Sequence, residues 1–108
     1  MVMTVRDMKI HVKSISGQNA VSSHHGDTLY QQILSAIDRD EVAELDFDGV
    51  EIFSTPFFNL AVARLLQDRS SSFLNDRVKF LNLSPVGFST LRRVIANAKD
   101  HYSQPTAH

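Results

Sequence analysis

The stretch LDFDGVEIFSTPFF, residues 45–58, joins the end of an apolar strand pattern to the start of a helix. Residues 42–47 predict a strand, with Leu45 and Phe47 on one face. Thr55 and Pro56 then suit a helix start, because threonine is a good N-cap and proline fits the first helical position. Residues 57–67 are largely apolar and predict a helix. The stretch therefore predicts a strand-to-helix connection of an α/β fold.

Upstream of this stretch, apolar and charged residues alternate over residues 8–13, which predicts a half-buried strand near the edge of a sheet. Residues 16–19 have turn composition, and residues 20–22 predict a short return strand. Asp27 or Thr28 is the expected cap of a helix that runs to about Arg39. Gln31 stands three residues after Thr28, where a capping box would place it.

Downstream, residues 77–83 predict a third strand, and Ser84-Pro85 opens the last helix. Its expected buried stripe consists of Leu91, Val94, Ile95 and Ala98, and its water-facing side consists of Arg92, Arg93 and Lys99. Alternating strands and helices predict one α/β domain over residues 1–100. We expect a mixed, mostly parallel sheet of about four strands flanked by three to four helices. Residues 101–108 are polar and predict a C-terminal tail.

Composition narrows the function classes. The chain has 108 residues, 43% of them hydrophobic, and no cysteine, which excludes a thiol nucleophile and a cysteine-ligated metal. The net charge of −1 and the scattered basic residues argue against nucleic-acid binding. We find no signal-peptide pattern and no apolar run of membrane-spanning length. A cytoplasmic protein that binds neither nucleic acid nor membrane is expected.

Candidate catalytic residues are few. Asp46 and Asp48 stand two apart on a strand pattern and would share a face, as Mg²⁺ binding or acid–base chemistry requires. Bonding in the turn near Gly49 is the interpretation we favour, and a small phosphoacceptor or enzyme is the alternative. His24 and His25 are expected in a surface loop without a third metal ligand. No nucleophile elbow or phosphate-binding loop is found. We expect a non-catalytic protein without metal or cofactor.

Residues 45–58 also resemble the core motif of STAS domains, which are named after sulfate transporters and anti-sigma factor antagonists. Three positions match the strand part of that motif: Asp46, Gly49 and Val50. Three others stand at its Asp-Ser-Ser triplet: Ser54, Thr55 and Pro56. The pattern is nearer to that of STAS-like domains of unknown function, and the likeness covers residues 20–99.

The resemblance implies a small α/β domain that docks a protein partner. In this family the partner is often a serine/threonine kinase of the histidine-kinase ATPase superfamily or an anti-sigma-like protein. The first hydroxyl of the triplet is phosphorylated in the anti-sigma antagonists, which cancels binding. By position this residue is Thr55, with Ser54 as the alternative. The implied partner-binding residues are Asp48, Ser54, Thr55, Pro56, Phe57 and Phe58.

Two alternatives stay open at this connection. Thr55 is either an N-cap only or the site of a phosphorylation switch, whose phosphate would add about −1.5 to −2 charges. Phe57 and Phe58 begin a helix that is apolar almost all round. Such a helix is either sandwiched in the core or presents one phenylalanine to a partner or to a homodimer contact. A dimerising or scaffold subunit without phosphorylation is therefore the second functional hypothesis.

Overall fold

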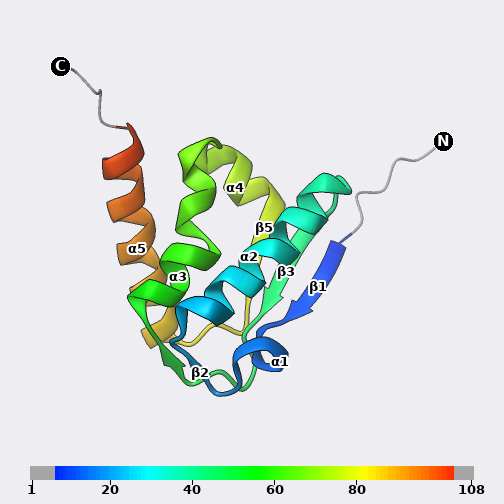
Figure 1. The fold of residues 1–108 in the computed structure, drawn as a ribbon, viewed down its shortest axis with the longest axis vertical. Helices are drawn as coiled ribbons and strands as arrows, with labels where there is room; N and C mark the ends of the chain where they lie inside the picture. The colour runs from blue at the N-terminus through cyan, green and yellow to red at the C-terminus, as the bar shows by residue number, and fades with distance from the viewer. Residues whose placement is uncertain (1–6, 104–108) are drawn as a thin grey trace.

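The computed structural model describes residues 7–103 (Figure 1). Three strands form the main sheet: β1 (Asp7–His11), β3 (Val42–Asp46) and β5 (Val78–Leu81). Their order is β1-β3-β5, and both pairs are parallel, with Ile10, Leu45 and Phe80 in register. A second pair, β2 (Asn19–Ala20) and β4 (Ile52–Phe53), is parallel as well. Every strand pair in the described chain is therefore parallel.

Helices connect these strands. The α-helices are α1 (Val12–Ser16), α2 (Ser23–Asp38), α3 (Thr55–Ala61), α4 (Ser71–Arg77) and α5 (Pro85–Ser103), and a 3₁₀ helix, η1 (Ala63–Gln67), follows α3. The predicted single α/β domain with a mostly parallel sheet is confirmed. The described chain has five α-helices instead of the three to four expected, because the short α1 and α4 were not predicted.

The core lies between the helices and one face of the main sheet, and Figure 1 shows α2 crossing in front of β3. Ile10, Leu45 and Val78 point from the three strands into this core. The ring of Phe47, just beyond β3, has its centroid 6.0 Å from that of Phe58 and 6.4 Å from that of Phe80. Buried aromatic rings thus join the sheet to α3.

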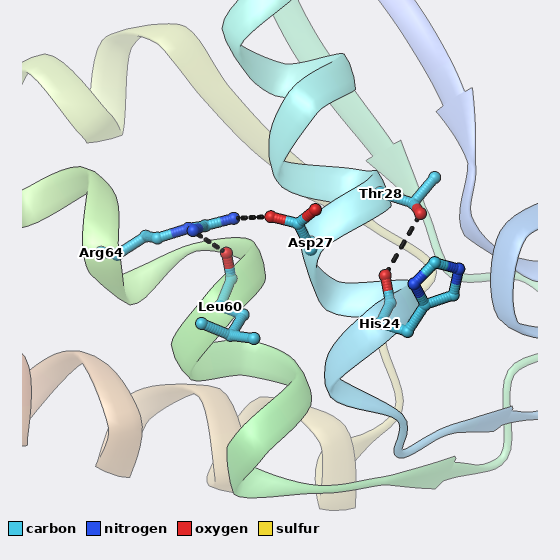
Figure 2. Close-up of polar contacts among 5 residues, drawn as sticks. All are labelled: His24, Asp27, Thr28, Leu60 and Arg64. Atoms are coloured by element: carbon cyan, nitrogen blue, oxygen red, sulfur yellow. Dashed lines mark hydrogen bonds and ion pairs between the residues drawn. The ribbon is translucent and has the colours of Figure 1, made fainter.

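A close approach between α2 and α3 is possible because Gly26 has no side chain. A Cβ at Gly26 would lie 2.6 Å from the Phe57 carbonyl oxygen, which is closer than real Cβ contacts. Arg64 of η1 fastens the same helices (Figure 2). Its guanidinium lies 3.5 Å from the centroid of the Tyr30 ring, its Nε donates to the Leu60 carbonyl (2.8 Å), and it pairs with Asp27.

The other face of the main sheet is charged. Lys9, Glu44 and Lys79 lie in register across β1, β3 and β5. The two lysines are exposed, and Glu44 is half-buried between them. His11, at the end of β1, is exposed as well. Strand side chains alternate between faces, so this face is opposite to the one that packs on the helices. Within residues 7–103 its lysines and His11 meet solvent, whereas Val42 and Asp46 on the same face are nearly buried.

The N-terminal elements differ from the expectation in two ways. The predicted strand over residues 8–13 ends at His11, and Val12 begins α1, although Val12 is still fully buried. The predicted return strand exists as β2, but it pairs in parallel with β4 and not back against β1. The turn at Gly17, where φ is 72°, carries the chain away from β1.

The start of α2 was predicted too late. Its N-cap is Ser22, whose side chain accepts a hydrogen bond from the His24 amide at 3.1 Å. Thr28 therefore lies inside the helix and donates to the His24 carbonyl (3.2 Å), as Figure 2 shows. Asp27 also lies inside the helix, where it binds Arg64. Neither of the two residues is a cap. The first residues of α2 are polar, so the apolar periodicity of the helix begins only at Leu29 and does not mark the helix start.

The helix predicted over residues 57–67 is interrupted at Val62, where φ is −126° and the chain changes from α3 to η1. The last helix begins at Pro85 as predicted, but α5 continues to Ser103, three residues into the predicted tail. Residues 1–6 of the predicted domain and residues 104–108 of the predicted tail lie outside the described residues.

Candidate functional site

Ser54 organises the connection between β4 and α3. Its hydroxyl oxygen accepts a hydrogen bond from the Phe57 amide (3.2 Å) and donates one to the Val21 carbonyl (2.9 Å). Its backbone is extended, with φ −131° and ψ 155°, as an N-cap requires. The prediction that Thr55 is the cap is therefore wrong by one residue. The same hydroxyl also links the helix start to the residue that follows β2.

Thr55 is the first residue of α3 and is exposed. Within residues 7–103, the Thr55 hydroxyl has no hydrogen-bond partner. Pro56, the second helical residue, is exposed beside it. Of the two alternatives for Thr55, the capping role is thus excluded, and a modifying enzyme would find the hydroxyl at the surface. Phosphorylation of Thr55 stays a prediction.

Phe57 and Phe58 are fully buried, with 0% of each residue exposed. The Phe58 ring is stacked on that of Phe53, with centroids 5.8 Å apart and an angle of 5° between the planes. The hypothesis that one of these rings belongs to a docking or homodimer surface disagrees with this burial, because both rings pack inside the core. In the first turn of α3, Thr55 and Pro56 are the side chains left for a partner.

Exposed apolar side chains lie next to this helix start. The parallel pairing of β2 with β4 continues so that Val21 lies beside Ser54, and Ile52 points to the same outward face two residues earlier. Val21 is 43% exposed and Ile52 is 54% exposed. Val86 of α5 is 67% exposed and precedes Gly87, where an added Cβ would lie 2.8 Å from the Phe53 ring.

We call this area the corner surface, and its residues are Val21, Ile52, Thr55, Pro56 and Val86. Sequence reasoning found Thr55 and Pro56 but missed the three apolar members. A two-residue strand is too short for its alternation to be recognised, so only the pairing of β2 with β4 reveals that Val21 and Ile52 face outward. Asp48, which was also predicted to bind a partner, is exposed in the turn after β3.

Asp46 serves a structural role at the end of β3. Its Oδ1 accepts hydrogen bonds from the Asn82 side-chain amide (2.9 Å) and from the Asp48 backbone amide (3.0 Å). These two donors, the Asn82 bond first, hold the pKa of Asp46 below its usual value of 3.8. The His11 Nδ1 lies 3.7 Å from Oδ2. Asp46 is 8% exposed. The preferred interpretation of turn bonding near Gly49 is thus confirmed for the Asp46 side chain.

The two carboxylates do not form a shared ligand site, since Asp46 is nearly buried and bonded while Asp48 is exposed. Among residues 7–103, no group of three or more His, Cys, Asp or Glu side chains is arranged to hold a metal ion. His24 and His25 lie in the first turn of α2, so their assignment to a loop was wrong.

The comparisons with known proteins identify the family. The model of the STAS-like domain of unknown function (DUF4325) matches residues 25–88, more than half of the 108-residue chain. The chain therefore belongs to the STAS-like domain family, and its parallel α/β architecture is consistent with a STAS-like fold. No curated protein and no solved structure matches the chain significantly. No helix within residues 7–103 has the length and apolar character needed to span a bilayer.

Proposed function

We propose that this protein is a non-catalytic regulatory module that docks a partner protein through the corner surface, in the manner of an anti-sigma factor antagonist. Phosphorylation of Thr55 cancels the docking. The observation that carries this proposal is the exposed Thr55 hydroxyl, unpartnered within the described chain, next to the exposed apolar side chains of Val21, Ile52 and Val86.

The physical basis of docking is the burial of these apolar side chains. Removal of apolar surface from water contributes roughly 25 cal/mol per Å². A phosphate on Thr55 would place about −1.5 to −2 charges among them. A partner that covers the corner surface would then have to desolvate the phosphate or leave a gap, and both reduce affinity. Modification of Thr55 thus opposes binding without any change of fold.

Ser54 is the less suitable phosphoacceptor. Its hydroxyl already binds the Phe57 amide and the Val21 carbonyl. A phosphate there would remove the cap of α3 and the link to β2. Modification of Thr55 leaves both contacts in place, so the domain stays folded when the partner is released. The proposed partner is a histidine-kinase-like ATPase with serine/threonine kinase activity, or an anti-sigma-like protein, as the family resemblance implies.

Docking is tested by calorimetric titration of the protein with kinases and anti-sigma-like proteins of this type encoded in the same genome. For a partner that binds wild type, Ile52→Asp and Thr55→Glu should each weaken binding at least about tenfold. The matched control is Ser72→Glu, which adds the same charge at an exposed position in the first turn of α4. Equal binding by all variants would rule out the corner surface as the docking site.

Phosphorylation is tested separately by intact mass after incubation with the same kinases and ATP. Wild type should gain one phosphate, and Thr55→Ala should gain none. Thr28→Ala is the control, because the Thr28 hydroxyl is bonded inside α2 and its loss should leave the reaction unchanged. Failure of every such kinase to modify wild type would remove the switch from the proposal and leave docking intact.

A further inference from the structure

A groove lies between α4 and α5, with β5 as its floor, and has a volume of about 370 Å³. Its apolar lining comes from three elements: Leu74 from α4, Phe80 from β5, and Phe88, Leu91 and Ile95 from α5. Leu74 and Leu91 belong to the buried core, whereas Phe88 is 49% exposed. Each helix thus contributes one core residue to the groove, and Phe88 leaves the α5 side open to solvent.

The charges in the groove have one sign. Arg92 and Lys99 line it, and no acidic side chain does, although the chain as a whole carries a net charge of −1. Phe88, Arg92 and Lys99 follow each other along one face of α5 at spacings of four and seven residues. Arg92 is exposed and forms no ion pair within residues 7–103. The groove therefore combines an apolar floor with a basic rim.

We propose that this α4–α5 groove docks a helical segment of a partner protein that carries apolar side chains beside acidic ones. The apolar side chains would pack against Phe80, Phe88 and Ile95. A carboxylate of the segment would pair with the Arg92 guanidinium, whose planar fork suits two parallel hydrogen bonds. An amphipathic helix buries only one face in such a groove, and its apolar residues are spaced three or four positions apart. The groove residues Phe88, Leu91 and Ile95 of α5 have the same spacing.

Two other occupants fit the groove less well. Small-molecule sites enclose about 70–90% of the ligand surface, whereas a groove with a half-exposed Phe88 leaves one side of its occupant in water. A second copy packed α5 against α5 would bring together the exposed Arg92 and Arg93 of both chains. Such like-charge contacts oppose association. Charge complementarity therefore favours an acidic segment of another protein.

The groove is distinct from the corner surface. Val86 belongs to the corner surface and Phe88 to the groove. Side chains two positions apart in a helix point in directions that differ by about 200° around the helix axis. An occupant of the groove therefore contacts another side of α5 than a partner on the corner surface. The proposal does not depend on Thr55 or on its phosphorylation.

The test is selection of a phage-displayed library of amphipathic helical peptides against the full-length protein. Selected peptides are synthesised with fluorescein, and their Kd is measured by fluorescence anisotropy. We expect peptides with a net negative charge and with leucine or aromatic residues at helical spacing. Phe88→Ser and Arg92→Glu should each raise the Kd at least about tenfold. Arg93→Glu, the same charge change at the neighbouring position outside the groove lining, should raise it less than about threefold.

Folding of the variants is checked by circular dichroism, and Arg92→Gln serves as a milder second variant that removes the charge without reversing it. Selection of no helical peptide, of peptides without acidic residues, or of peptides that bind Phe88→Ser and Arg92→Gln as well as wild type would overturn the proposal. Sedimentation supplies another decisive result. A wild-type dimer that Phe88→Ser converts to a monomer would assign the groove to a second copy of this chain and refute the acidic segment.

Discussion

Asp46 ties the ends of two strands together through one carboxylate oxygen. The oxygen accepts from the Asn82 side chain beyond β5 and from the Asp48 amide in the turn after β3. Both donors favour the ionised carboxylate, and Asn82 holds a left-handed backbone (φ 56°) to reach it. The carboxylate that the sequence offers as a catalytic candidate thus forms structural hydrogen bonds.

The lowered pKa of Asp46 predicts how stability depends on pH. Ionised Asp46 stabilises the fold above the usual carboxyl pKa of 3.8, and this contribution disappears as the pH falls through the lower folded-state pKa. Asp46→Asn should therefore lower the urea midpoint near neutral pH, and the difference from wild type should shrink in increasingly acidic buffer. Asp48→Asn, at an exposed side chain, is the control and should change little. A difference for Asp46→Asn that is constant from neutral to strongly acidic pH would contradict this assignment.

The role of a residue could be predicted from the sequence where it depends on neighbours in the chain. It could not be predicted where it depends on the pairing of distant strands. The turn role of Asp46 followed from its place before Gly49, where φ is 84°. The outward orientation of Ile52 did not follow, because it depends on the parallel pairing of β2 with β4 across more than thirty residues of chain. The burial of Phe57 could not be decided either, since an apolar helix start suits a core or an interface equally well.

At the scale of elements, the start of α3 separates two hydroxyls that the sequence places side by side. Ser54 caps the helix and binds the end of β2, whereas the Thr55 hydroxyl makes no hydrogen bond within the described chain. Sequence favoured Thr55 as the cap because proline follows it, and proline is most common at the first helical position. Here Pro56 is the second helical residue, which the unbonded amides of a first turn also permit.

This division predicts opposite effects of two neighbouring substitutions. Ser54→Ala should destabilise the protein by about 1–2 kcal/mol, because it removes an N-cap and a hydrogen bond to the Val21 carbonyl. Thr55→Ala should change the free energy of unfolding by less than about 0.5 kcal/mol, since its side chain is exposed. Chemical denaturation of both variants measures the two values. A larger loss for Thr55→Ala than for Ser54→Ala would return the cap to Thr55.

The helix predicted over residues 57–67 shows the limit of periodicity as a signal. The apolar pattern predicts one continuous helix, yet the chain forms α3, a break at Val62, and η1. Val62 and its neighbours Ala61 and Ala63 are all buried, so packing in the core determines the break, and neither glycine nor proline marks it. The strand β3 was predicted well because five consecutive residues between two parallel neighbours keep a continuous pattern.

In the whole molecule, the helices and the charged face lie on opposite sides of the main sheet. Parallel sheets are commonly covered on both faces. Here a single row of charged side chains, Lys9, Glu44 and Lys79, crosses the second face, and both lysines are exposed in the described part of the chain. The molecule is accordingly thin, with extents of 45 × 42 × 23 Å.

This layering predicts a gradient of protection in native-state hydrogen exchange. The amides of Ala43 and Leu45 in β3 should exchange slowest, because β3 lies between two strands and both side chains are fully buried. Amides of β1, which lies at an edge of the sheet, should exchange faster. NMR measures this residue by residue. Protection of the whole of β1 equal to that of β3 would indicate that a further strand or a partner covers that edge.

The contact between the Arg64 guanidinium and the Tyr30 ring also provides an intrinsic spectroscopic signal. The chain has no tryptophan and two tyrosines, so its ultraviolet spectrum near 280 nm comes from tyrosine. One of the two, Tyr30, has its ring held 3.5 Å beneath a guanidinium where α2 meets η1. A ring fixed in such asymmetric surroundings gives a near-ultraviolet dichroism band that vanishes when packing loosens. Separation of these two helices can therefore be followed spectroscopically in the unlabelled protein.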